Sequence, residues 1–252
     1  MLNAQRTVAA SKDGMFLGSL VRVARLECDL KESDAIQQIE LMRKELATDE
    51  RRLTIQDYGA GVSPLSLKES SGSRDRSVSA IHASSAIPSH WGVFLFRLVR
   101  ELKPRHVLEL GANLGVSASY IRAAMDLNEN EGRLVTIEGD PTLASIAKEN
   151  IARISSGRAD VMIGKFQDIL PAALDSLGSV DLAFIDGHHE EEPTYRYYHL
   201  IKPYVTDEAV MIFDDIYLWS RPVRRAWKRI VAEERRAVVI DLAKIGILKF
   251  NS

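Results

Sequence analysis

The chain has 252 residues, and its 33 Lys and Arg against 35 Asp and Glu leave a formal net charge of −2. This balance excludes the strongly basic composition typical of nucleic-acid-binding proteins, although it does not exclude a local basic patch. Cys28 is the single cysteine, so the chain has neither an intrachain disulfide nor a cysteine-rich metal site, as is typical of a reducing cytosol. The first twenty residues lack the apolar core of a secretory signal, and no apolar run reaches membrane-spanning length. We therefore expect a cytoplasmic protein without a membrane segment.

Residues 1–88 are predicted to form an N-terminal helical extension with a lid loop, ahead of a second domain over residues 89–252. Apolar residues at helical spacing predict two amphipathic helices, carried by Leu17, Leu20, Val21, Ala24 and Leu26 and by Ile36, Ile39, Leu41, Met42 and Leu46. Ser33 and Asp34 are the expected N-caps of the second helix. Because these helices lie outside the main sheet, residues 1–50 are predicted to mediate homodimerisation.

Residues 57–77 are rich in Gly, Ser and Pro, which is typical of a loop. Two interpretations stay open: a lid that brings Tyr58 or Arg76 to a ligand, or a plain linker. The glycines in "DYGAG" (57–61) do not indicate a second ligand turn, because the preceding "RRLTIQ" is half charged and not a strong apolar strand.

From Ser89 onward, helices and strands alternate. "SHWGVFLFRLVREL" (89–102) predicts a helix with a serine cap that Pro104 stops. Seven short apolar runs follow: "HVLEL", "LVTIE", "DVMIG", "DLAFID", "AVMIFDD", "AVVIDL" and "GILKF". Helical stretches are expected at 115–127, 141–154, 166–177, 193–204 and 219–235. The short "AK" between the last two runs permits only an antiparallel hairpin. The prediction is an α/β, Rossmann-like, doubly wound and mostly parallel seven-stranded sheet with an antiparallel C-terminal hairpin.

The stretch "HVLELGANLGVSASY" (106–120) predicts a strand, a glycine turn and a helix. Gly111 and Gly115 permit the bend, but Ala118 stands where a dinucleotide fingerprint has its third glycine. The turn therefore suits a ligand without phosphates. Glu138 ends the next strand, at the distance expected for an acid that bonds ribose hydroxyls. Together these features indicate a ribose-containing ligand.

Ordered motifs over roughly residues 105–220 carry a family resemblance: "VLELGANLGVSA", "GKFQDILPAAL", "DLAFIDGHH" and "MIFDDI". They resemble the class I S-adenosylmethionine-dependent methyltransferases, and especially the catechol O-methyltransferase-like branch. The resemblance implies S-adenosylmethionine as cofactor. Its binding residues would be Glu109, Gly111, Ala112, Ser117, Glu138, Phe166, Gln167 and Asp186.

The resemblance also implies a role for each of these positions. Glu109, Gly111 and Ala112 would face the methionine part, and Ser117 would bond its carboxylate. Glu138 would hold both ribose hydroxyls. The adenine would lie beside Phe166 and Gln167, and the sulfonium above Asp186.

Acidic residues follow two strands that we expect to be neighbours. Asp186, Asp214 and Asp215 would meet at one mouth, where three carboxylates require a cation among them. Oxygen ligands suit Mg²⁺, and the resemblance implies magnesium at these positions. Catechol-type enzymes have an amide where this chain has Asp215, and Asp214 and Asp215 converge only if their strand has already ended. The alternative is that one Asp caps a helix and another touches only cofactor.

His188 and His189 directly follow the first acidic strand end, and either imidazole can take a proton from an acceptor hydroxyl. Counting from Asp186, His189 aligns with the lysine base of catechol-type enzymes. The predicted catalytic residues are therefore Asp186, His189 and His188, with His189 preferred. The alternative is a loop histidine that only hydrogen-bonds, and His82 and His90 are expected to be structural.

The predicted function is O-methylation of a small-molecule hydroxyl with S-adenosylmethionine, assisted by Mg²⁺. The alternatives are methylation of RNA or protein, or a non-catalytic binding module. The basic segment 219–236 is interpreted as an ordinary amphipathic helix with a solvated charged face, rather than as an RNA-binding surface.

Overall fold

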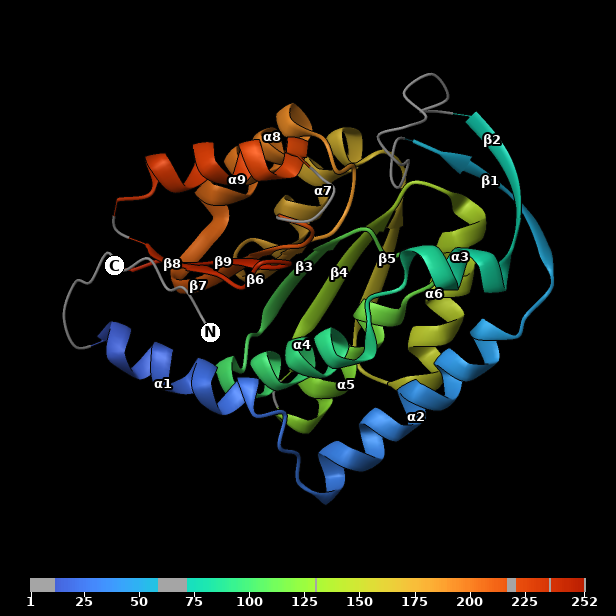
Figure 1. Cartoon of the computed structure of the whole chain (residues 1–252), viewed down its shortest axis with the longest axis horizontal. Helices are drawn as coiled ribbons and strands as arrows, with labels where there is room; N and C mark the ends of the chain where they lie inside the picture. Colours follow the sequence, from blue (N-terminus) through green and yellow to red (C-terminus); the bar gives the residue numbers. More distant parts are fainter. Residues whose placement is uncertain (1–11, 59–71, 130, 217–220, 236, 252) are drawn as a thin grey trace.

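The computed structural model describes residues 12–58, 72–129, 131–216, 221–235 and 237–251 (Figure 1). Within these ranges, no helix is both long enough and apolar enough to cross a membrane.

A seven-stranded sheet forms the centre of the molecule, in the order β5-β4-β3-β6-β7-β9-β8. Its strands are β3 (His106–Leu110), β4 (Arg133–Glu138), β5 (Ala159–Ile163), β6 (Val180–Ile185), β7 (Val205–Phe213), β8 (Val238–Asp241) and β9 (Gly246–Lys249). Strands β3 to β7 pair in parallel, whereas β9 pairs antiparallel with both β7 and β8. The predicted sheet and its antiparallel hairpin are confirmed. The chain order reverses beside β3, which places the β3 turn at the switch point where such sheets bind ligands.

Helices cover both faces of this sheet (Figure 1). One layer holds α1 (Lys12–Ala24), α2 (Leu30–Ala47), α4 (Ser89–Leu102), α5 (Val116–Leu127) and α6 (Pro141–Ile154). The other holds α7 (Phe166–Leu177), α8 (Glu191–Ile201), which continues as a 3₁₀ turn over Lys202–Tyr204, and α9 (Arg221–Glu233). Burial on both faces explains why the strands read as continuous apolar runs rather than as alternating ones.

The two N-terminal helices exist, but their start signals and faces differ in detail from the prediction. Helix α2 begins at Leu30, because Asp29 and Glu32 form a reciprocal capping box; Ser33 and Asp34 already lie inside the helix. Ile39, Met42 and Leu46 are buried as expected, whereas Leu41 and Val21 are exposed. Helix α1 contacts α4, and α2 contacts α5, so their apolar faces join the core of the main domain.

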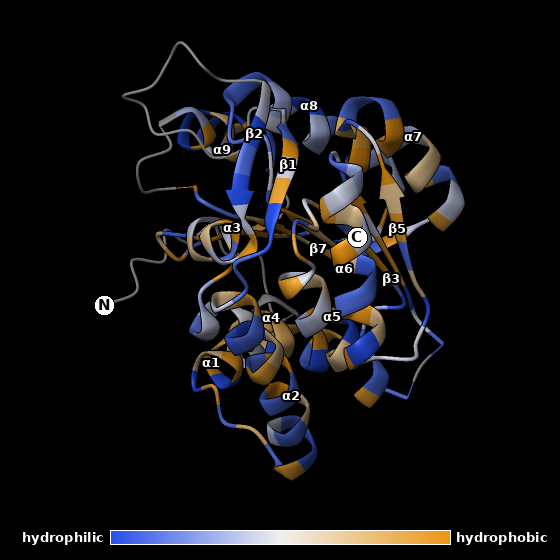
Figure 2. Ribbon diagram, turned by 90° about the vertical axis from the view of Figure 1, so that its right-hand side faces the viewer, coloured by the Kyte–Doolittle hydropathy of each residue, from blue (hydrophilic) through white to orange (hydrophobic). Residues whose placement is uncertain are grey.

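The predicted loop over 57–77 is wrong for its last six residues. Strand β2 (Gly72–Ser77) pairs antiparallel with β1 (Arg52–Asp57) in a separate two-stranded sheet, and α3 (Val78–Ser85) follows directly. Figure 2 shows β2 as hydrophilic beside the more apolar β1, so no alternation marked it as a strand. Residues 59–71, which include the "GAG" of "DYGAG", lie outside the described residues.

The predicted serine cap of α4 is also wrong. Pro88 occupies the N-cap position, with no side-chain cap, and the Ser89 hydroxyl donates to Glu40 instead.

Candidate functional site

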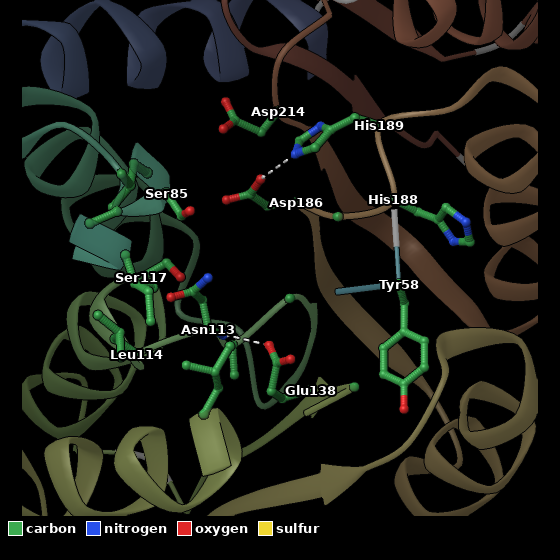
Figure 3. Close-up of a pocket in the computed structure, with 18 of the residues that line it drawn as sticks. Tyr58, Ser85, Asn113, Leu114, Ser117, Glu138, Asp186, His188, His189 and Asp214 are labelled. Atoms are coloured by element: carbon green, nitrogen blue, oxygen red, sulfur yellow. Dashed lines mark hydrogen bonds and ion pairs between the residues drawn. The ribbon is translucent and has the colours of Figure 1, made fainter. Parts of the chain in front are cut away.

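A cavity of about 650 Å³ lies at the carboxyl ends of the parallel strands. A cavity of this size is within the range of small-molecule sites. Its wall combines the turn after β3, the end of β4, the start of α7 and the loops after β6 and β7. The N-terminal part closes the remaining side, through Tyr58, Arg76 and the end of α3, including Ser85 (Figure 3).

The two glycines of the β3 turn make room for protein backbone. Gly111 has φ +103°, and a Cβ there would lie 1.9 Å from the Asp186 carbonyl oxygen. Gly115 has φ +78°, and a Cβ there would lie 2.8 Å from Ala147 Cα in α6. Gly111 therefore lets the loop after β6 approach the turn, and Gly115 lets α5 pack on α6. Of the two, Gly111 lines the cavity, as expected of a ligand turn.

Glu138 stands at the end of β4 with its carboxylate already oriented. Its Oε2 accepts from the Asn113 backbone N–H (2.8 Å), and its Oε1 accepts from the Asp140 backbone N–H (3.0 Å). Burial raises the pKa of this carboxyl, and the backbone N–H groups counteract that rise. Each carboxylate oxygen keeps a further acceptor site. Glu138 can thus receive two more hydrogen bonds, such as those from vicinal hydroxyls.

Ser117 lies in the first turn of α5 and lines the cavity. The N-cap, Gly115, offers no side-chain cap, so the helix presents unsatisfied N–H groups and a partial positive charge. This end of the cavity suits an anionic group, as the carboxylate prediction for Ser117 requires.

Phe166 and Gln167 open α7 and also line the cavity. The Phe166 ring packs directly over Gly187, where a Cβ would lie 2.4 Å from its Cε2, and edge-on to Tyr197. An apolar ring held by two neighbours forms a fixed wall for a flat ligand group.

Glu109, in contrast, is fully buried within the sheet and not among the residues that line the cavity. The Thr136 hydroxyl donates to its Oε2 at 2.5 Å, while its Oε1 has no hydrogen-bond partner. Burial raises the pKa of Glu109 to about 7. Ala112, which the resemblance grouped with Glu109, does line the cavity.

The three predicted acidic residues do meet at one end of the cavity. Strand β7 ends at Phe213, and Asp215 adopts a left-handed conformation with φ +53°, so Asp214 and Asp215 both reach the mouth. Burial, followed by repulsion from Asp214 and Asp215, raises the pKa of Asp186 well above its ordinary value. Burial, followed by repulsion from Asp215, also raises the pKa of Asp214.

The two histidines point in different directions (Figure 3). His189 Nε2 lies 3.8 Å from Asp186 Oδ1, and its Nδ1 lies 4.0 Å from Asp215 Oδ2. His188 turns away and pairs through Nδ1 with the Tyr197 hydroxyl at 2.8 Å. Both have positive φ, +65° for His188 and +28° for His189, a strained backbone of the kind that concentrates at functional loops. The geometry therefore favours His189 over His188 as the group beside a reacting oxygen.

Sequence reasoning missed Lys244, which enters the same mouth from the turn between β8 and β9. Its Nζ donates to Asp214 Oδ2 at 2.8 Å and to Asp215 Oδ1 at 2.5 Å. Its position follows from the fold, because β9 runs antiparallel to β7 and Gly246 pairs with Phe213. The residues just before β9 must therefore lie beside those just after β7.

Lys244 bears on whether magnesium fits. Mg²⁺ binds oxygen ligands at about 2.0–2.1 Å. An ion on Asp214 Oδ2 would lie within about 5 Å of the lysine ammonium, and at an effective dielectric constant near 20 the two would repel by about 7 kcal/mol. Nor do any three His, Cys, Asp or Glu side chains in the described part of the chain form a metal-binding group. The residues present do not fit the predicted Mg²⁺ ion.

The basic face of α9 is largely engaged by acids. Arg225 and Arg229 pair with Glu191 at the start of α8, and Arg224 pairs with Asp241. Val223, Trp227 and Ile230 are buried, as predicted for an ordinary amphipathic helix. Trp219 and Arg236 lie outside the described residues.

The sequence and the fold are similar to those of known methyltransferases. Residues 108–216 match a family model described as a methyltransferase domain. A catechol O-methyltransferase from Niastella koreensis is 33% identical over 115 residues, which are 45% of this chain and 49% of that protein. This chain therefore matches about half the length of that curated relative.

Solved structures share the fold over a wider range. The O-methyltransferase TomG from Streptomyces achromogenes, solved in complex with SAM, superposes with a TM-score of 0.57 at 21% identity, covering 67% of this chain and 83% of that one. An S-adenosylhomocysteine-bound methyltransferase from Podospora anserina gives a TM-score of 0.58 at 12% identity, covering 98% of this chain and 100% of that one. Residues 108–216 are thus similar in sequence to a methyltransferase domain, and the sheet around them has the fold of solved methyltransferases.

Proposed function

We propose that this chain is an S-adenosylmethionine-dependent methyltransferase that acts on a hydroxyl oxygen of a small molecule. The observation that carries the proposal is one cavity with a positioned carboxylate, Glu138, at one end and the Asp186–His189 pair at the other (Figure 3). The names of two curated relatives, both catechol O-methyltransferases, point to the same chemistry.

The described residues fit this cofactor from end to end. Glu138 offers acceptors for the ribose hydroxyls, and the first turn of α5 at Ser117 suits the amino-acid carboxylate. Phe166 and Gln167 border the space for the adenine. The largely buried carboxyl of Asp186 would face the cationic sulfonium. When bound, S-adenosylmethionine supplies a methyl group on a positively charged sulfur.

The chain itself has three tasks in such a transfer: to align the acceptor, to exclude water and to remove the hydroxyl proton. His189 is the proposed base, because its Nε2 lies 3.8 Å from Asp186 Oδ1, at the end of the cavity where the acceptor would react. Alignment needs no covalent enzyme intermediate. The wall formed by Tyr58, Arg76 and α3 would separate the acceptor from solvent.

We also propose a division of the chain at residue 88 into an N-terminal part and a methyltransferase domain, and both parts contribute residues to the cavity. The N-terminal part supplies Tyr58, Arg76 and Ser85 to the wall, so we assign it to the active site rather than to a detached extension. No observation favours RNA as substrate, because the arginines named on α9 are paired with acids.

A generic assay for S-adenosylhomocysteine release, run over a panel of small hydroxyl compounds, tests the function. We expect turnover with at least one member, and a loss of turnover in Asp186→Asn while the thermal melt is retained. Release that is equal in wild type and Asp186→Asn would contradict the assigned site, and S-adenosylmethionine binding without release for any acceptor would favour a binding module.

A further inference from the structure

Lys244 is built into the acidic mouth as a fixed cation. The Ile216 backbone N–H donates to its carbonyl oxygen at 2.9 Å, which fastens the hairpin turn to the loop that carries Asp214 and Asp215. Its side chain is 17% exposed, and the side chain of Asp214 is only 5% exposed. The ammonium is therefore held from both the backbone side and the carboxylate side.

The surroundings of Lys244 leave room for one more hydrogen bond. A lysine ammonium has three donors, and two of them go to Asp214 and Asp215. Asp214 Oδ1 is buried and has no hydrogen-bond partner among the described residues, so this mouth also offers a free hydrogen-bond acceptor to a ligand. Both Lys244 and His189 line the cavity beside Asp186.

The charge pattern also shows why a lysine belongs here. Asp186, Asp214 and Asp215 bring three carboxylates to one mouth. Lys244 contacts Asp214 and Asp215, and so compensates part of their negative charge. The ammonium therefore stands among the carboxylates at which a divalent ion would bind.

We propose that the Lys244 ammonium takes the part of a divalent cation, holding the acceptor oxygen beside His189 so that methyl transfer requires no metal ion. This inference rests on the proposed methyltransferase function. The acceptor oxygen forms its bond to the methyl carbon and loses its proton to His189. The carbon–sulfur bond of the donor breaks, and its electron pair stays on sulfur as a neutral thioether. Lys244 keeps its protons, and its positive charge stabilises the negative charge that develops on the acceptor oxygen.

The first test measures metal binding without any turnover. Chelator-treated wild-type protein is titrated with Mn²⁺ and followed by electron paramagnetic resonance, which counts free ion. We expect no specific binding to wild type. Lys244→Met should gain a Mn²⁺ site at the freed carboxylates, whereas Lys244→Arg should not. Lys249→Met is the matched control, because Lys249 is a buried, ion-paired lysine of β9 outside the cavity, and its loss should create no such site.

The second test uses the S-adenosylhomocysteine release assay with and without EDTA. Wild type should be insensitive to EDTA, and Lys244→Met should lose about 100-fold or more in kcat/KM, the usual cost of removing one donor from a developing oxyanion. Lys244→Arg should lose less. Wild-type binding of Mn²⁺, or activity that EDTA abolishes and Mg²⁺ restores, would overturn the proposal.

The two tests fail in distinguishable ways. If calorimetry shows no S-adenosylmethionine binding, the proposed function fails, while the Mn²⁺ titration still decides whether Lys244 occupies the cation position. If Lys244→Met does not fold, as judged by circular dichroism, wild type and Lys244→Arg still carry the test through the EDTA and Mn²⁺ measurements.

Discussion

Replacing Glu109 by Gln should remove a large pH dependence from the stability of the protein. Glu109 is fully buried in β3, and burial raises the pKa of its carboxyl from 4.5 to about 7. A carboxyl with a raised pKa stabilises the fold at low pH, where it is protonated in both states. That contribution disappears as the pH rises from 4.5 through about 7, because the unfolded chain then ionises more readily. The pKa difference corresponds to about 3 kcal/mol.

Glutamine keeps the shape of the side chain, still accepts the Thr136 hydrogen bond and cannot ionise. Urea unfolding without ligand, followed from about pH 4.5 to about pH 8, measures the effect. The stability of Glu109→Gln relative to wild type should rise by about 3 kcal/mol over this window. Glu131→Gln, at an exposed carboxylate, should show no such change. A stability difference between Glu109→Gln and wild type that stays constant with pH would refute the reasoning.

Three further predictions can be tested, two from the geometry and one from the sequence. Gly111→Ala should destabilise the fold by at least about 3 kcal/mol, because the new Cβ would collide with the Asp186 carbonyl oxygen. Gly178 also has a positive φ, but nothing lies within 4 Å of a Cβ there, so Gly178→Ala should cost only about 1 kcal/mol. Equal losses of stability for the two variants in chemical denaturation would count against this reasoning. His189→Gln should lower kcat by about 100-fold and His188→Gln by much less, and the reverse order in steady-state assays would move the base to His188. Homodimerisation through residues 1–50 remains a prediction, and light scattering that gives a monomer mass for the full chain would exclude it.

The seven strands and the mostly parallel sheet could be predicted because each strand is a short apolar run, and the parallel ones are buried on both faces. The turn after β3 and the acid at the end of β4 follow from the same pattern, since ligand sites lie at the carboxyl ends of parallel strands. Glu138, Asp186 and Asp214 all line one cavity for this reason.

The N-terminal contribution to the site was harder to predict. Strand β2 reads "GSRDRS", and only its pairing with β1 makes it a strand, so composition favoured a loop. The start of α2 was misplaced although Asp29 and Glu32 have the spacing of a capping box. Residue propensity alone could not decide either case. Pairing with β1 determines that residues 72–77 form a strand, and the cap formed by Asp29 and Glu32 determines where α2 begins.

The cation at the acidic mouth was missed for a topological reason. Three carboxylates do require a cation, as the sequence indicated, but the ion was assumed to come from solution. Lys244 is 29 residues beyond Asp215, and only the antiparallel return of β9 along β7 brings it to the site.

The central claim is that Glu138 and the β3 turn hold S-adenosylmethionine, and isothermal titration calorimetry tests it most directly. Wild type should bind S-adenosylmethionine and not NAD. Glu138→Gln should bind it about 10- to 100-fold more weakly at an unchanged melting temperature, the cost of hydrogen bonds to a charged acceptor. Tight NAD binding without S-adenosylmethionine binding, or equal S-adenosylmethionine affinity in wild type and Glu138→Gln, would contradict it.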